Sequence, residues 1–312
     1  MSTPRPTLAF LGPEGTFAHA ALRALPAAAG ANMLPMANVT LAIDAVRSGL
    51  ADGALVPLEN SVEGAVPATL DELASGQPLV IAEETYLQVC FDLLARAGTR
   101  LSDVHSVATH PHAEAQVRRW LLDNLPGAAV HLVGSTAGAA QAVSAGEFDA
   151  AVSSAVAGEL YGLVALASDI ADTEGAVTRF VLLTRPATPP PSTGNDRTTL
   201  VAYLREDHAG ALLEILSEFA TRAVNLTRIE SRPTKGRIGQ YCFSIDCEGH
   251  IEDERVGDVL AALHRVCADV RYLGSYPRRE GKQGAVPPGR SDAEFLESRE
   301  WLRRIRAEGT TF

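Results

Sequence analysis

Small polar residues and glycines stand where predicted strands of the first 185 residues give way to helices. Five such joints occur: GPEGT at 12–16, ENSVEG at 59–64, THP at 109–111, ST at 135–136 and SS at 153–154. A helix N-terminus offers unpaired backbone N–H groups and about half a positive charge. Because the carboxyl ends of parallel strands share one edge of a sheet, we expect these joints to line one crevice. Such a crevice suits a small polyanion, although Ser and Thr also cap helices that bind nothing.

The charges of this region restrict how it could hold an anion. Residues 1–185 contain nine Arg, no Lys and nineteen Asp or Glu, so their net charge is −10. Lysine chemistry, such as a Schiff base or a P-loop, is therefore excluded there. The tripeptide TRF at 178–180 supplies Arg179, whose planar guanidinium suits a carboxylate, and Phe180, which offers a ring face.

Other partners are excluded by composition. The whole chain has a net charge of −11, which argues against nucleic acid or an anionic membrane. His110 and His112 flank a proline and are not spaced as a helical ligand pair, so we expect no metal and no cofactor. The four cysteines show no C-x-x-C pair, no apolar stretch approaches ~20 residues, and no signal peptide is visible. We expect a cytoplasmic protein.

The elements that position these residues alternate along the chain. Helix-like runs separate the predicted strands, which indicates an α/β region with largely parallel sheets, divided into two small lobes. The predicted strands are 7–11, 32–36, 53–57, 106–109, 129–133, 149–152 and 177–183. A Pro-rich linker at 186–197 follows this region of 1–185.

The second half of the chain has a different order of elements. Residues 198–278 are patterned βαββαβ, which is the ferredoxin-like arrangement. The tail, 279–312, contains one capped, amphipathic segment at 291–306 that we expect to form a short helix.

The order of these motifs is similar to that of a known family. GPEGTF (12–17), PLENSVEG (57–64), THP and TRF together resemble prephenate dehydratases, and GAL (210–212) with ESRP (230–233) resembles an ACT domain. The resemblance covers about residues 5–278. It implies a two-lobed catalytic region like a periplasmic binding protein at 1–185, with the active site between the lobes, and an ACT regulatory domain at 198–278. The chain departs from the family pattern at Ala176, where Asn is frequent, and at Ala209, where Pro is frequent.

The resemblance also implies a reaction and the residues that perform it. The enzyme would be a carbon–oxygen lyase of L-phenylalanine biosynthesis that converts prephenate to phenylpyruvate. Thr178 would assist the leaving hydroxyl, with Glu63 as the second candidate for proton donor. The implied substrate contacts are Thr16, Asn60, Ser61, Thr109, Ser154, Arg179 and Phe180. L-Phenylalanine would bind where ACT domains pair in a homodimer or homotetramer, near Gly210, Ala211, Leu212, Glu230, Ser231 and Arg232.

Three alternatives stay open at this point. Arogenate differs from prephenate by one amino group, and the sequence does not choose between the two substrates. A solute-binding receptor would share the lobed fold without the chemistry. A ligand-sensing regulator would use the ACT domain but should carry a DNA-binding helix-turn-helix or a basic face. The sign of the phenylalanine effect is likewise open.

Overall fold

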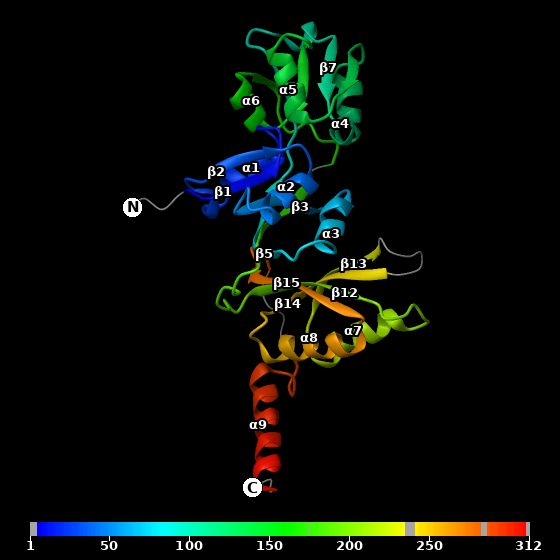
Figure 1. Cartoon of the computed structure of the whole chain (residues 1–312). Coiled ribbons are helices and arrows are strands. Elements are labelled where there is room, and N and C mark those ends of the chain that lie inside the picture. Colours follow the sequence, from blue (N-terminus) through cyan, green and yellow to red (C-terminus); the bar gives the residue numbers. More distant parts are fainter. Residues whose placement is uncertain (1–4, 174, 235–240, 282–285, 310–312) are drawn as a thin grey trace. The chain divides into compact units, whose positions relative to one another are not determined.

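A computed structural model describes residues 5–173, 175–234, 241–281 and 286–309. The chain divides into two compact units (Figure 1). The first contains the residues up to Thr69 together with Thr85–Leu183, and the second contains Leu70–Glu84 together with the residues from Thr184 onward. Residues 70–84, which belong to the predicted catalytic region, thus group with the predicted regulatory part.

The first lobe of the first unit is built on a sheet of order β2-β1-β3-β11-β5, to which β4 adds by pairing with β3. Its strands are β1 (Thr7–Leu11), β2 (Asn32–Met36), β3 (Gly53–Asn60), β4 (Gly64–Ala65), β5 (Val80–Gln88) and β11 (Val177–Thr184). Helices α1 (Phe17–Ala24) and α2 (Val39–Arg47) pack on β1 and β3. A short 3-10 helix, Pro26–Ala28, follows α1, and α3 (Pro67–Leu73) follows β4.

The second lobe has a sheet of order β10-β6-β9-β7-β8. Its strands are β6 (Asp92–Ala95), β7 (Ser106–Thr109), β8 (Ala129–Leu132), β9 (Ala150–Ser153) and β10 (Val164–Ala167). Its helices are α4 (Pro111–Asn124), α5 (Thr136–Ser144) and α6 (Ala155–Tyr161), with a 3-10 turn at Leu101–Asp103. The chain enters this lobe after β5 and returns before β11, so two connections join the lobes. This confirms the predicted two-lobed architecture, which is that of a periplasmic binding protein.

The pairing of the second sheet is mixed rather than parallel throughout. β7 pairs in parallel with β8 and β9, but β6 is antiparallel to both β9 and β10. The sequence pattern did not predict β5, β6 or β10.

The second unit has the predicted ferredoxin-like order βαββαβ. Its antiparallel sheet has the order β13-β14-β12-β15, formed by β12 (Asp196–Tyr203), β13 (Leu226–Pro233), β14 (Tyr241–Glu248) and β15 (Asp269–Pro277). Helices α7 (Ala211–Thr221) and α8 (Glu254–Val266) contact each other. Ile215, Phe219, Val256 and Leu263 of these helices share one buried core with alternate residues of β12 and β14. Residues on the opposite face of β12 and β14 include buried polar groups, among them Arg197 and Asp246.

A final helix, α9 (Asp292–Glu308), lies in the tail, over the segment 291–306 that was predicted as helical. Ser291 and Glu294 form a capping box at its start, and Gly309 ends it in the left-handed conformation with φ 67°. Across the described residues, none of the helices has both the length and the apolar composition needed to cross a membrane.

Candidate active site

A cavity of about 400 Å³ lies between the two lobes of the first unit. Leu11, Phe17 and Pro57 line it from the first lobe, and Phe91, Ala113 and Gly134 line it from the second. Its polar lining comes from Thr16, Asn60, Glu63, His110, His112, Gln116, Ser135, Thr136 and Thr178. Five predicted site residues therefore meet here: Thr16, Asn60, Glu63, Thr178 and Phe180.

Three helices begin at this cavity. Thr16 caps α1, His110 caps α4 and Ser135 caps α5, each with a side chain that accepts from a backbone N–H of the first turn. The positive ends of three helix dipoles thus converge on one space. None of the described residues that line it is Arg or Lys, so among these residues the positive potential comes from the helix ends.

The hydroxyl of Thr178 is oriented by Asn60. The Asn60 Oδ1 accepts from the backbone N–H groups of Val62 at 2.8 Å and Glu63 at 3.0 Å, which fixes the orientation of the amide. Its Nδ2 therefore donates to the Thr178 Oγ1 at 2.8 Å. Because this oxygen already accepts, the hydroxyl hydrogen is left to donate to another group. Thr178 is 8% exposed and faces the cavity, so that group can be a bound molecule.

Glu63 is held by the opposite lobe. Its carboxylate lies 2.6 Å from the His112 Nδ1 and accepts from the Gln116 Nε2 at 3.0 Å. Both partners lie on α4, four residues apart and therefore on one face of the helix. The contact joins the two lobes at the cavity, which all three residues line. Neither Gln116 nor His112 was among the predicted site residues, although a spacing of four residues after a predicted helix start is a usable signal.

His110 lies beside this bridge. Its ring is 5.2 Å from that of His112, centroid to centroid. Burial lowers the pKa of His110, the neighbouring His112 lowers it further, and Glu63 opposes both effects. The His110 Nδ1 accepts from the backbone N–H of His112 at 3.3 Å, as a neutral ring can.

Four predicted substrate contacts lie outside the cavity lining. The Ser61 Oγ accepts from the backbone N–H of Val177 at 2.9 Å, which braces β11 just before Thr178. Thr109 is fully buried and donates to the Val152 carbonyl at 3.1 Å. The Ser154 Oγ donates to the Gly15 carbonyl at 2.8 Å, and this bond ties the second lobe to the first.

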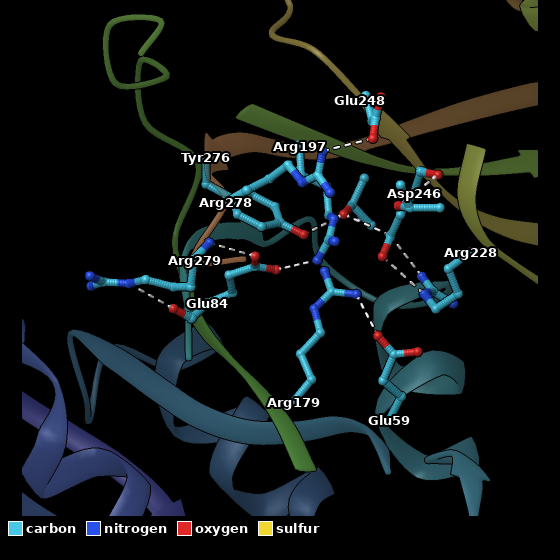
Figure 2. A network of polar contacts seen from close by, with 12 residues as sticks. Glu59, Glu84, Arg179, Arg197, Arg228, Asp246, Glu248, Tyr276, Arg278 and Arg279 are labelled. Carbon is cyan, nitrogen blue, oxygen red and sulfur yellow. Dashed lines mark hydrogen bonds and ion pairs between the residues drawn. The ribbon is translucent and has the colours of Figure 1, made fainter. Parts of the chain in front are cut away.

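Arg179 is the fourth. It lies between Thr178 and Phe180 on β11, and side chains alternate along a strand, so it points to the other face. Its guanidinium is buried and pairs with Glu59 at 2.7 Å (Figure 2).

A separate cavity of about 360 Å³ lies in the second unit. It is lined at the start of α7 by Gly210, Ala211 and Leu212 and on β13 by Ser231, which are four of the six predicted effector residues. Gly210 has φ +98°, a conformation that favours glycine at this helix start. The other two, Glu230 and Arg232, are each one strand position from Ser231 and so lie on the opposite face of β13. Arg232 pairs there with Asp71 at 2.9 Å.

No group of three or more His, Cys, Asp or Glu within the described ranges is arranged to hold a metal ion.

Known families match both parts of the chain. The prephenate dehydratase model matches residues 8–188, and the ACT domain model matches residues 198–265. A prephenate dehydratase from Amycolatopsis methanolica is 49% identical over 300 residues, which cover 96% of this chain and 97% of that protein.

Solved structures agree with these matches. A prephenate dehydratase from Arthrobacter aurescens, solved in complex with L-Phe, is 48% identical, with a TM-score of 0.91 over 96% of this chain and 99% of the other. A structure described as a novel type of quorum quenching acylase is 35% identical, with a TM-score of 0.77 over 87% of this chain and 97% of the other. On these matches, the chain belongs to the prephenate dehydratase family and carries an ACT domain.

Proposed function

We propose that this chain is a lyase that converts prephenate to phenylpyruvate, carbon dioxide and water in the cavity between its two lobes. The observation that carries the proposal is the Thr178 hydroxyl, which Asn60 leaves free to donate into a space ringed by three helix N-termini. Prephenate is a dianion, and a site that combines helix dipoles with one oriented donor matches its charges.

The proposed reaction balances without a cofactor. The bond from the ring to its carboxylate breaks, and carbon dioxide leaves. The electron pair of that bond completes the aromatic ring and expels the 4-hydroxyl, which takes up one proton and departs as water. Thr178 donates a hydrogen bond to this hydroxyl as its charge develops. Glu63, which contacts both His112 and Gln116, is the carboxyl group among the described lining residues and is assigned to supply or relay the proton.

Binding of the substrate is assigned to the remaining lining. The helix starts at Thr16, His110 and Ser135 stabilise the two carboxylates through backbone N–H groups and dipoles. Phe17, Phe91 and Phe180 face the ring and exclude water. The four predicted contacts outside the lining then have an indirect role: they hold β11 and the lobes in place and do not touch the substrate. These residues are Ser61, Thr109, Ser154 and Arg179.

The test is turnover of prephenate by the purified chain. Phenylpyruvate, read by its ultraviolet absorbance in alkali, should appear with prephenate, and kcat/KM for arogenate should be lower. Binding of prephenate without phenylpyruvate would identify a receptor instead. A higher kcat/KM for arogenate would reassign the substrate but keep the chemistry.

One relative is described as an acylase, and that activity requires catalytic groups different from those of a dehydratase. Cleavage of an acyl bond requires a nucleophile beside a general base. The Thr178 hydroxyl is paired with an amide, and that of Thr16 donates to the Leu11 carbonyl at 2.8 Å. Among the described residues that line the cavity, no hydroxyl forms a hydrogen bond with a histidine ring. These contacts support dehydration over acyl transfer.

The second unit is proposed to sense L-phenylalanine in the cavity at Gly210, Ala211, Leu212 and Ser231. The proposal is supported by the relative solved with L-Phe and by the match of the ACT model. Glu230 and Arg232 then shape β13 from its other face. Titration of L-phenylalanine should raise the melting temperature and change the turnover of prephenate. The Leu212→Glu variant should lose both effects, whereas Leu122→Glu, on the exposed face of α4, should keep them.

We also propose the division into a catalytic region at 1–185, a linker at 186–197 and an ACT domain at 198–278. A homodimer or homotetramer and a cytoplasmic location complete the proposal. All four cysteines are free, and Cys242, Cys247 and Cys267 are buried, as suits a reducing compartment.

A further inference from the structure

Helix α9 is attached to the second unit at its first half only. Asp292 accepts from the backbone N–H of Arg255 at 3.0 Å and from its Nε at 3.1 Å. Arg299 forms an ion pair with Glu254 and lies 3.5 Å from Asp258, so α8 holds α9 on one side. Figure 1 shows α9 continuing away from α8. Within the described ranges, no hydrogen bond or ion pair joins residues 300–309 to another element.

The unattached half carries large apolar side chains in contact with water. Trp301 is 45% exposed and Leu302 is 39% exposed, while Ile305 on the same side is partly exposed. In proteins most of the stability of a helix comes from packing of its apolar face rather than from intrinsic helix propensity. A free helical half that presents a tryptophan and two aliphatic residues on one side therefore indicates a surface that is covered in the assembled protein.

The charges of α9 indicate what covers it. Its first half carries Asp292, Glu294, Glu297 and Glu300 with a single Arg299, and its second half carries Arg303, Arg304 and Arg306 with a single Glu308. An antiparallel copy of the same helix would set the acidic half of each against the basic half of the other. A parallel copy would set like charges together. An anionic lipid surface or nucleic acid would attract the arginines but repel the glutamates and a chain of net charge −11.

We propose that α9 pairs antiparallel with α9 of a second copy of this chain, through Trp301 and Ile305. At 100° per residue, Glu297 lies about 40° and Arg304 about 60° from Trp301, on the same flank. In an antiparallel pair the same flanks of the two helices meet. Glu297 therefore faces Arg304 of the partner subunit, and Arg304 faces the partner's Glu297. The pairing is independent of the catalytic site.

Charge reversal on the full chain tests this arrangement. Glu297→Arg and Arg304→Glu each place like charges on the meeting flanks, and the double variant restores opposite charges. Particle mass is followed over protein concentration by sedimentation equilibrium. We expect each single variant to raise the dissociation constant of one assembly step at least tenfold and the double variant to return it to within about threefold of the wild type.

Two further variants complete the test. Trp301→Ser should weaken the same step. Arg303→Glu, about 160° round the helix from Trp301, is the matched control and should leave it unchanged. Prephenate turnover is compared between variants that are in the same oligomeric state, and it shows that each variant is folded. The proposal is overturned if the single reversals and Trp301→Ser assemble like the wild type. It is equally overturned if Arg303→Glu has the same effect as Arg304→Glu, or if the helix instead sediments the chain with anionic phospholipid vesicles.

Discussion

The Asn60 amide donates to the Thr178 hydroxyl across 118 residues of sequence, at 2.8 Å. Asn60 lies at the end of β3 and Thr178 at the start of β11, and these strands are neighbours in one sheet. The bond fixes which way the hydroxyl can donate. Asn60 is thus a positioning residue for the proposed catalytic group.

Removal of that hydroxyl tests its role directly. Thr178→Val keeps the shape of the side chain, so we expect kcat to fall by about 10² to 10⁴ while KM changes much less. Thr178→Ser keeps the hydroxyl and should retain most of the activity. Steady-state kinetics on prephenate give both constants, and near-wild-type turnover by the valine variant would remove Thr178 from the mechanism.

Loss of the contact between Glu63 and His112 should affect substrate binding only weakly. The two side chains are 39% and 67% exposed, so their interaction contributes little free energy. We expect His112→Ala to raise KM for prephenate by about fivefold at most. His131→Ala is the control, because His131 packs on Phe148 outside the cavity lining. A loss of kcat with KM unchanged would show that His112 takes part in the chemistry rather than in holding the lobes together.

His19 makes stability depend on pH. The Gly15 N–H donates to its Nδ1 at 2.9 Å, and burial lowers the pKa of His19 below 6.5, with Arg23 adding to this and Glu14 opposing it. The unfolded chain therefore binds the proton more readily. The stabilisation is complete above pH 6.5 and is lost as the pH falls through the lowered pKa.

Urea unfolding at pH 5 and pH 8 measures this loss. We expect His19→Gln to reduce the difference between the two pH values, whereas the same change at exposed His264 should not. An unchanged difference in the His19 variant would assign the pH dependence to other groups.

The ion pair of Glu84 with Arg197 predicts a large effect on stability. Their side chains are 0% and 8% exposed, and the Arg197 Nη1 lies 2.5 Å from the Glu84 Oε2 (Figure 2). The backbone N–H of Arg279 also donates to Glu84, at 3.1 Å. Loss of one partner leaves a buried charge, so Arg197→Met should lower the free energy of unfolding by about 3–5 kcal/mol.

A double-variant cycle measures the interaction free energy between Glu84 and Arg197 alone. Arg197→Met combined with Glu84→Gln should cost less than the sum of the single changes, because the second change removes the unpaired charge. Glu114→Gln, in a partly exposed i, i+4 pair with Arg118, should change stability much less. Additive effects at positions 84 and 197 would contradict the strength assigned to the pair.

Local signals in the sequence determined much of the fold. Ser135, Ser154 and Ser291 cap helices as their residue types predict, because an N-cap depends on a side chain and the next three residues. Apolar periodicity likewise depends on neighbours in the chain, and it predicted the α/β alternation, the βαββαβ order and the tail helix. The motifs that carry the family resemblance placed Thr16, Asn60, Glu63, Thr178 and Phe180 in one site.

Only the tertiary structure decided which of the remaining polar groups face the cavity. Arg179 is a plausible carboxylate ligand by type, but the alternation of β11 turns it toward Glu59. His112 and Gln116 meet Glu63 only because α4 approaches from the other lobe. Residues 70–84 group with the second unit through contacts to residues more than a hundred positions away, such as Arg197 and Arg232. Periodicity and capping are set by a few neighbouring residues, whereas these contacts depend on how distant segments pack, which no local pattern encodes.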